Sequence, residues 1–229
     1  IETVRSQPAM AGLDLAEQVS TTEPYIVEPI GEHKFTVVAY DMGIKTNTPR
    51  NFAHRGIRTI VVPANTPYAD IAAYNPDGVF VSNGPGDPAT ADTMVGIVRD
   101  ILAAKIPFFG ICFGNQILGR ALGLNTYKMK FGHRGINVPV LNHLTGTIDI
   151  TSQNHGFALE GTAGTTFTTP YGDAQVTHTC LNDGTVEGVA LTSGLAYSVQ
   201  YHPESAAGPH DANPLFDQFI TLMANHKTH

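Results

Sequence analysis

Short apolar runs recur along residues 35–122 and alternate with segments of helical length. The runs are rich in β-branched and aromatic residues, which predicts four strands: FTVVAY (35–40), IRTIVV (57–62), GVFVS (78–82) and PFFGI (107–111). Proline is favoured in a first helical turn, so Thr48-Pro49 and Thr66-Pro67 predict two helix starts, and two more helices are expected near 91–104 and 114–122. The alternation predicts a parallel sheet with helices on both faces.

The pattern changes after residue 136. Closely spaced apolar runs, separated by Gly, Asn and Asp, predict strands that add to the sheet in antiparallel fashion: IDITS (148–152), QVTHTC (175–180), TVEGVAL (185–191) and AYSVQY (196–201). A closing helix is predicted over 213–225. Residues 35–229 therefore read as one α/β domain with a mostly parallel, open sheet. Residues 1–34 are polar, contain three prolines and have no sustained period, so they are interpreted as a linker or arm.

Composition and charge narrow the function classes. The net charge is -7 and the sequence has no run of Lys and Arg, which argues against binding to nucleic acid or to an anionic membrane surface. No apolar stretch approaches the ~20 residues that span a bilayer, and the N-terminus has no secretory pattern, so a cytoplasmic protein is expected. Two cysteines form no disulfide framework. Because the chain starts with Ile1, we expect upstream sequence to be missing.

Cys112 lies between two glycines in GICFG (110–114), where a predicted strand gives way to a predicted helix. This is the form of a nucleophile elbow with cysteine in place of serine. The glycines allow a sharp, closely packed turn, and the N-terminus of the following helix offers NH groups to an oxyanion and lowers a thiol pKa. The alternative is a small buried hydrophobic residue, which is what most free cysteines are.

His202 and Glu204 supply a candidate base and its partner. The run YSVQYHPES ends a predicted strand at His202-Pro203-Glu204, because proline interrupts the hydrogen-bonded ladder. The carboxyl edge of a parallel sheet is where α/β proteins place their sites, and Cys112 is predicted at the same edge. Residues two apart in an extended chain face the same way, so Glu204 is positioned to accept the ring NH of His202. A surface turn is the alternative for this tripeptide alone.

Two polar segments are candidate binding elements. SNGPGDP (82–88) follows a strand, and Gly84 and Gly86 leave backbone NH groups accessible to a substrate; the alternative is a plain strand-to-helix connection. It is not a P-loop, because the chain contains no G-x-x-x-x-G-K. QNHGF (153–157) reads by itself as a polar turn after a strand.

Taken together, SNGPGDP, GICFGNQ, KMKFGHRGIN, TSQNHGF, NDGTVEG and HPESAAGPHD resemble the glutaminase domain of carbamoyl-phosphate synthetase small subunits, a branch of the class I (triad) glutamine amidotransferases. The elbow and His-x-Glu are shared by the whole class, whereas KMKFGHRGIN, QNHGF and AGPHD look particular to this subunit. The resemblance runs from about residue 35 to the C-terminal helix and implies a flavodoxin-like sheet. The segment GLDLAEQVSTTEPY also resembles the family's connector between two domains.

The resemblance implies hydrolysis of L-glutamine to glutamate and ammonia through a thioester. Cys112 is then the nucleophile, His202 the base and Glu204 the residue that holds the imidazole. Backbone NH groups of Gly86 and Phe113 are expected to stabilise the oxyanion. Residues expected to bind glutamine are Gly84, Gly86, Phe113, Gln116, Asn154, Gly156 and Phe157.

The family also implies a partner. Ammonia passes through a tunnel to a large subunit, in a heterodimer or higher oligomer, which makes carbamoyl phosphate for arginine and pyrimidine synthesis from bicarbonate and ATP. No cofactor is expected on this chain, and ATP and its metal are expected on the partner. A glutaminase subunit of the purine or anthranilate type is an alternative. A non-catalytic scaffold of the same fold is another.

Some features depart from the family or stay outside the expected site. The family often has His where Asn115 stands, and its small subunits carry a further N-terminal domain that this chain does not contain. Lys128, Lys130, His133 and Arg134 are interpreted either as a solvated basic loop or as a surface that faces the partner. Cys180 is expected in the core. Because the ten histidines show no ligand spacing, no metal site is predicted.

Overall fold

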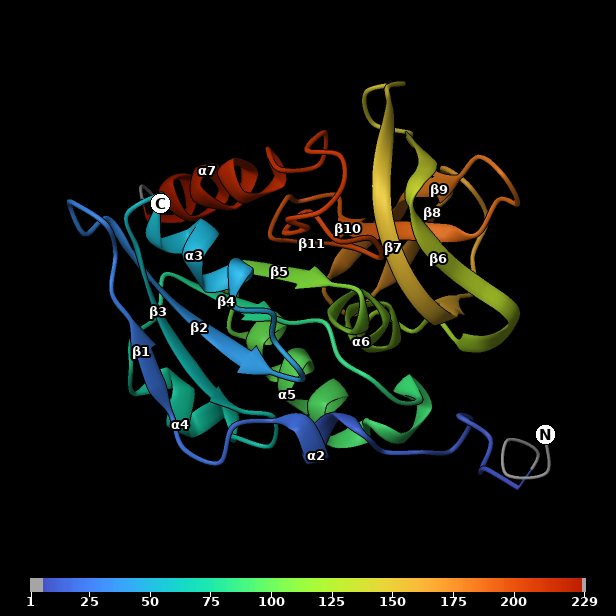
Figure 1. Cartoon of the computed structure of the whole chain (residues 1–229). Helices are drawn as coiled ribbons and strands as arrows, with labels where there is room; N and C mark the ends of the chain where they lie inside the picture. Colours follow the sequence, from blue (N-terminus) through green and yellow to red (C-terminus); the bar gives the residue numbers. More distant parts are fainter. Residues whose placement is uncertain (1–5, 228–229) are drawn as a thin grey trace.

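A computed structural model describes residues 6–227 of the chain and contains an eleven-stranded sheet (Figure 1). The strands are β1 (Tyr25–Val27), β2 (Phe35–Asp41), β3 (Ile57–Pro63), β4 (Gly78–Val81), β5 (Phe108–Ile111), β6 (Thr126–Asn142), β7 (Ile148–Leu159), β8 (Thr166–Thr169), β9 (Gly172–Cys180), β10 (Val186–Leu191) and β11 (Ala196–Val199). The helices are α2 (Ala16–Val19), α3 (Asn47–Ala53), α4 (Tyr68–Ala72), η1 (Pro88–Thr90), α5 (Asp92–Ala103), α6 (Phe113–Ala121) and α7 (Leu215–Lys227).

The parallel part of the sheet has the strand order β3-β2-β4-β5-β11. Numbered along the chain, this is the 2-1-3-4-5 order of flavodoxin-like sheets, in which ligands bind beyond the carboxyl ends of the strands. Strand β1 adds to the edge in antiparallel orientation against β3. The carboxyl ends of β4, β5 and β11 are therefore the expected place for a site.

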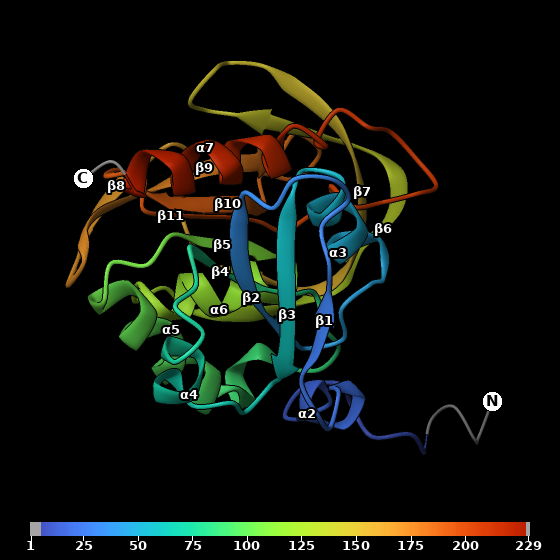
Figure 2. The ribbon, with the colours of Figure 1, turned by 90° about the vertical axis from the view of Figure 1, so that its left-hand side faces the viewer.

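Helices cover both faces of these strands (Figure 2). In β2, Val38 and Tyr40 face one side and pack in the core formed with α4, α5 and α6. Val37 and Ala39 face the other side and pack in the core formed with α3 and α7. Nearly continuous burial along β2, β4 and β5 explains why their sequences are unbroken apolar runs rather than alternating ones.

The C-terminal half is more antiparallel than the sequence suggested. Strands β10, β7, β6 and β9 pair in antiparallel fashion, and because β9 also pairs with β10 the four close into a ring. Five of the eleven strands make the parallel set, so the expectation of a mostly parallel, open sheet is wrong for the whole chain. The run AYSVQY, read as an antiparallel addition, forms β11, which also pairs with β5 in parallel.

Two local interpretations were also wrong. The basic residues 128–134 lie within strand β6 and not in a loop, and QNHGF lies inside strand β7 and is not a turn. In β7 the alternation expected of a strand is present, but its buried positions carry polar side chains such as Gln153 and His155. A pattern read from apolar residues alone therefore does not detect this part of the strand.

The described part of the arm, residues 6–34, is packed on the domain. Ala16 in α2 is 1% exposed and belongs to the core on the α5 face. The backbone NH of Thr21 donates to Asp41 Oδ2 at 2.9 Å, and β1 extends the sheet. The division into an arm over 1–34 and a domain over 35–229 stays a prediction. Residues 1–5 lie outside the described part.

Candidate active site

Cys112 occupies the sharp turn between β5 and α6, as the sequence predicts. Its backbone has φ 55° and ψ -98°, a positive-φ conformation that L-residues rarely adopt. The side chain is buried, with 5% exposure, and its backbone NH donates to Val199 O at 2.8 Å. The thiol therefore lies where strands β5 and β11 end side by side.

The two elbow glycines permit close packing. A Cβ atom on Gly114 would lie 2.2 Å from the carbonyl oxygen of Val81, and one on Gly110 would lie 2.7 Å from the carbonyl oxygen of Gly114. Real Cβ atoms do not approach other atoms this closely, so neither position accepts a side chain without a backbone shift. The glycines fix how near α6 approaches strand β4.

His202 and Glu204 follow β11 and lie together beside Cys112. His202 Nδ1 is 2.7 Å from Glu204 Oε1. A carboxylate only accepts, so Nδ1 carries the proton and donates it. His202 is 5% exposed and Glu204 is 1% exposed, which makes this a buried pair. The expectation that the two residues face the same way agrees with this geometry.

Lys45, in the loop between β2 and α3, joins this pair and was not anticipated. Its Nζ atom lies 3.1 Å from Glu204 Oε1 and 3.1 Å from His202 Nδ1. Because Nδ1 already carries a proton, the attractive contact is the ion pair with Glu204. Nothing in the sequence around Lys45 signals this role, because the contact spans 159 positions between two loops.

The ionisation of the group follows from these contacts. Burial lowers the pKa of His202, but interactions with Cys112 and Glu204 outweigh burial and raise the pKa to about 9. Burial would raise the pKa of Glu204, but the hydrogen bond and charge of His202 and the charge of Lys45 lower it. His202 Nε2 is buried without a hydrogen-bond partner of standard geometry among the described residues. This atom is free to exchange a proton with a neighbouring thiol or substrate.

A cavity of about 430 Å³ opens over Cys112. Eight of the ten residues predicted to act on or bind glutamine line it: Gly84, Gly86, Cys112, Gln116, Asn154, Gly156, Phe157 and His202. The other two do not line it: Phe113 packs its side chain in the core, and Glu204 is buried and hydrogen-bonded to His202. Sequence reasoning missed Lys45 and His155, which also line the cavity, and assigned Lys128 and Arg134 to a loop or partner surface.

Two backbone NH groups, that of Gly86 in the cavity lining and that of Phe113 directly after Cys112, are candidates for binding an anion. Within residues 6–227, neither Gly86 nor Phe113 donates a backbone hydrogen bond. Phe113 is the first residue of α6, where an NH has no partner inside the helix. Gly86 has φ 101°, which favours glycine, and the arm packs against it so closely that a Cβ would lie 2.8 Å from Leu13 O. These are the two groups that the family resemblance assigns to an oxyanion.

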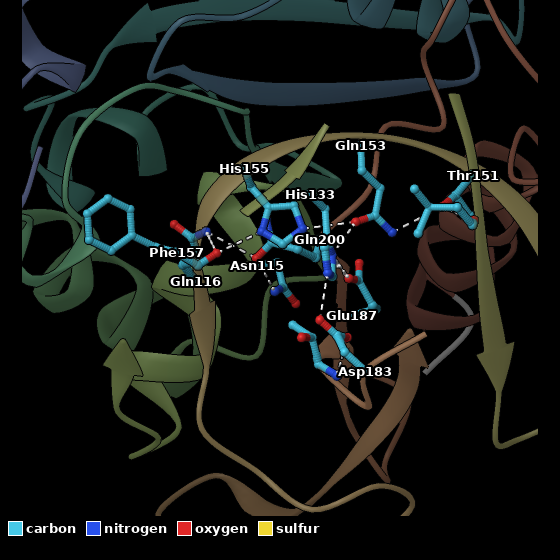
Figure 3. A network of polar contacts seen from close by, with 12 residues as sticks. Asn115, Gln116, His133, Thr151, Gln153, His155, Phe157, Asp183, Glu187 and Gln200 are labelled. Atoms are coloured by element: carbon cyan, nitrogen blue, oxygen red, sulfur yellow. Dashed lines mark hydrogen bonds and ion pairs between the residues drawn. The ribbon is translucent and has the colours of Figure 1, made fainter. Parts of the chain in front are cut away.

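Buried amides support the wall of the cavity (Figure 3). Gln116 Nε2 donates to Phe157 O and to Gln200 Oε1, both at 3.0 Å. Asn115 donates from Nδ2 to Gln200 Oε1 at 3.3 Å and accepts from Ser198 Oγ at 2.9 Å. Asn115, the residue that departs from the family pattern, is thus fully buried and partnered behind the cavity.

Cys180, the second cysteine, is 1% exposed at the end of β9, which confirms the expected core position. Burial raises the pKa of its thiol to about 11. The two cysteines of the chain thus differ in setting, since only Cys112 lines the cavity.

A family model and curated proteins of similar sequence both point to the same family. Residues 37–222 match the family model described as glutamine amidotransferase class-I. The chain is 81% identical over 227 residues to the carbamoyl phosphate synthase small chain of Corynebacterium diphtheriae, covering 99% of this chain and 60% of that protein. Its identity to the protein of the same name from Mycobacterium tuberculosis is 66% over 227 residues, covering 98% and 60%. The chain thus spans about 60% of the length of these curated relatives.

Solved structures with low sequence identity share the fold. A putative GMP synthase component from Thermoplasma acidophilum superposes with a TM-score of 0.70 at 20% identity, covering 86% of this chain and 98% of that chain. A glutamine amidotransferase from Thermotoga maritima gives a TM-score of 0.57 at 17% identity, covering 86% and 87%. Within residues 6–227, no helix has the length and apolar character needed to cross a membrane.

Proposed function

Since the chain belongs to the class-I glutamine amidotransferase family, we propose that it hydrolyses L-glutamine to glutamate and ammonia with Cys112 as nucleophile. The observation that carries the proposal is the meeting of three residues from two distant parts of the sequence. Cys112 lies on a strained turn at the cavity, His202 adjoins it, and Glu204 binds the far side of the imidazole at 2.7 Å. A buried structural cysteine would need none of these.

The chemistry follows from the positions of the atoms. His202 Nε2 takes the thiol proton of Cys112, and the thiolate attacks the side-chain amide carbon of glutamine. The oxyanion is held by the free NH groups of Gly86 and Phe113, where one such donor is worth roughly 3 kcal/mol. His202 then gives its proton to the departing nitrogen, which leaves as ammonia. Water, activated by the same imidazole, cleaves the γ-glutamyl thioester and restores the thiol.

Glu204 and Lys45 act through His202. The Glu204 carboxylate holds the Nδ1 proton in place, so that Nε2 is the atom that faces Cys112, and it stabilises the imidazolium that forms. Lys45 keeps this carboxylate ionised through the 3.1 Å ion pair. Lys45 is therefore a positioning residue, and a substrate does not need to touch it.

The cavity provides the remaining contacts for glutamine. Its lining includes two glycines, Gly84 and Gly156, two residues with side-chain amides, Gln116 and Asn154, and the aromatic residue Phe157. A volume of about 430 Å³ is at the lower end of the range of small-molecule sites. The mixture of backbone groups and amides suits a small zwitterion with an amide end.

We further infer that the ammonia serves carbamoyl phosphate synthesis. The 81% identity to a carbamoyl phosphate synthase small chain favours this over a purine or anthranilate type, since the GMP synthase relative shares 20% identity and shows only the fold. The partner is then a large synthetase subunit that binds bicarbonate, ATP and the metal ion that ATP requires. This chain itself is proposed to need no cofactor for glutamine hydrolysis.

Labelling tests the nucleophile. A glutamine analogue with a chloroketone in place of the side-chain amide should alkylate one residue per chain, and peptide mapping should find the adduct on Cys112. Cys180→Ser is the matched control, because it removes the other buried cysteine and should leave labelling unchanged. The proposed site would be refuted if the label is found on any other residue, or if excess glutamine does not protect Cys112 from labelling.

Activity assays separate the alternatives. Cys112→Ser should abolish ammonia release, whereas a non-catalytic scaffold would release none in either form. Adding the large carbamoyl phosphate synthase subunit with ATP and bicarbonate should accelerate glutamine hydrolysis and yield carbamoyl phosphate. If only a purine or anthranilate partner subunit has this effect, the assignment of the ammonia is wrong while the glutaminase chemistry stands.

A further inference from the structure

Four polar side chains converge between strands β6, β7 and β10, beside the glutamine cavity (Figure 3). They are His133 from β6, Gln153 and His155 from β7, and Glu187 from β10. His155 is 5% exposed and Glu187 is fully buried. So many buried polar groups in one place need partners of matching chemistry.

Four distances between inward-facing atoms of this cluster lie near those of a tetrahedral ligand set, and the ligand atoms of His133, His155 and Glu187 all lie within 4.8 Å of one another. Gln153 Oε1 lies 2.9 Å from His133 Nδ1 and 2.9 Å from His155 Nε2. Glu187 Oε1 lies 3.1 Å from His133 Nδ1 and 3.6 Å from His155 Nε2. Zinc bonds of about 2.0–2.1 Å in a tetrahedron place the ligand atoms about 3.4 Å apart.

The outer ring nitrogen of each histidine, which faces away from the centre of the cluster, also lies within hydrogen-bond distance of an oxygen. His155 Nδ1 is 2.8 Å from Phe157 O, and His133 Nε2 is 2.9 Å from Asp183 Oδ2. A carbonyl oxygen and an ionised carboxylate only accept, so these outer nitrogens carry the protons. In the neutral rings, Nδ1 of His133 and Nε2 of His155 therefore present lone pairs to the centre. A carbonyl or carboxylate behind the ring is the arrangement found for histidines that bind metals.

Gln153 cannot turn its NH₂ group to these lone pairs without losing its hydrogen bond to Thr151 Oγ1. Thr151 Oγ1 donates its only proton to Val138 O at 2.8 Å, so it must accept from Gln153 Nε2, which lies 3.1 Å away. This fixes the amide with Oε1 towards the two histidines. Two nitrogen lone pairs and oxygens of Gln153 and Glu187 then face one another.

The centre therefore suits a bound cation, because two ring nitrogens and two oxygens face one another there. The two imidazole rings approach edge to face, with centroids 4.9 Å apart, so that both can present a nitrogen to one point. Glu187 Oε2 is buried and has no hydrogen-bond partner among residues 6–227. A cation that binds the carboxylate removes that deficit.

We propose that His133, His155, Glu187 and Gln153 form a binding site for one divalent transition-metal ion, with Zn²⁺ as the best-matched ion. Two imidazoles with two oxygen ligands suit zinc better than calcium or magnesium, which prefer oxygen ligands alone. Four protein ligands with no open position are typical of a structural and not a catalytic zinc site. The ion would join three strands of the β10-β7-β6-β9 ring.

Sequence spacing could not show this cluster. The expectation of no metal site rested on the lack of a local histidine motif, but these ligands are brought together by strand pairing, in which His133 lies opposite His155. The site also adjoins the cavity, because Phe157 O accepts both from His155 and from Gln116. A bound ion would thus fix one wall of the cavity without touching the substrate.

The test is a zinc titration of the full chain that carries Cys112→Ser and Cys180→Ser, so that no thiol can bind the metal. Competition against a chromophoric chelator should show one Zn²⁺ per chain, with a dissociation constant below micromolar. Zinc at 100 times its dissociation constant should raise Tm by about 5–10 °C, because it binds the folded chain alone. The readout does not depend on glutaminase activity.

Matched variants locate the site. Glu187→Gln and His133→Gln keep the side-chain size closely enough to fold, and each should weaken zinc binding at least 100-fold, whereas His143→Gln, outside the cluster, should bind like the parent. Circular dichroism confirms that each variant is folded. The proposal is overturned if the thiol-free chain binds no zinc at micromolar concentration, if zinc leaves Tm unchanged, or if Glu187→Gln binds as tightly as the parent.

Discussion

The strained backbone at Cys112 predicts an unusual response to glycine. At φ 55° and ψ -98° an L-residue brings its Cβ into conflict with its own backbone, whereas glycine has no Cβ and adopts this conformation freely. Replacing Cys112 by Ala removes the sulfur but keeps the conflict, and replacing it by Gly removes both. The difference between these two variants therefore reports the strain that the fold stores at the proposed nucleophile.

The magnitude follows from three opposing contributions. Going from Ala to Gly loses about 0.5–1 kcal/mol through the larger entropy of the unfolded chain and about 0.8 kcal/mol through one less buried methyl group. Relief of a strained backbone returns about 1–3 kcal/mol. At position 112 these contributions nearly cancel, so the Gly variant should be about as stable as the Ala variant.

Ala121 provides the matched control, because it is buried, with 3% exposure, at the end of the helix that follows Cys112 and has no positive φ. Ala121→Gly should lower the free energy of unfolding by roughly 2 kcal/mol, since the same losses act there without relief of strain. Urea denaturation of the four proteins gives both differences. In thermal melts the gap between the two sites should be about 4–8 °C for ~2 kcal/mol of strain.

An equal Ala-to-Gly loss at both positions would refute the reasoning. It would mean that the turn relaxes to an ordinary conformation in solution, so that no strain is stored at Cys112. Both variants at position 112 lack the thiol and should be inactive, so the stability comparison stays separate from the glutaminase assay.

The remaining predictions concern packing and charge. Gly114→Ala places a Cβ 2.2 Å from a carbonyl oxygen of β4 and should lower the free energy of unfolding by about 3 kcal/mol or more. Gly96→Ala has open space around the new Cβ and should raise the free energy of unfolding by up to about 1 kcal/mol. The urea midpoints of the two variants should therefore move in opposite directions. Lys45→Met removes the cation that lowers the pKa of Glu204, so the acid limb of the pH-rate profile should move upward and kcat/KM should fall about fivefold, whereas Lys45→Arg should restore both. His178 is buried, which lowers its pKa from 6.5 to about 4, so between these values only the unfolded chain holds the proton. Stability should therefore fall as the pH drops from 6.5 to 4, and His178→Gln should flatten that loss in melts across this range.

The sequence could predict the residues that face the cavity where the signal is local. The elbow is contained in five residues, and His202 and Glu204 are two apart, so strand geometry alone places them on one side. Their proximity to Cys112 required only that β5 and β11 end at the same sheet edge, and the parallel pairing of these strands places them there. Lys45 lacked any such local signal, because its contact with Glu204 depends on how two loops meet in space.

The second part of β7 could not be predicted, and the reason is physical. Only residues 148–152 of this strand were predicted, because the buried positions beyond them, Gln153 and His155, are polar, and a search for alternating apolar residues misses them. These side chains are buried because they satisfy one another and His133 opposite them, an outcome of pairing between β6 and β7. Buried polar networks of this kind are set by tertiary structure and leave little trace in hydropathy.

The position of the proposed oxyanion donor depends on residues outside the parallel sheet. Gly86 keeps φ 101° while the arm lies against it, and the contact is fixed from both sides: Asp87 N donates to Leu13 O at 2.9 Å, and Gly12 N donates to Asp87 Oδ2 at 2.8 Å. The turn is too polar and too rich in glycine to hold this shape by burial of its own side chains. The arm thus contributes to the candidate site through backbone hydrogen bonds, which is why its composition resembles a linker although it shapes the turn next to the proposed nucleophile.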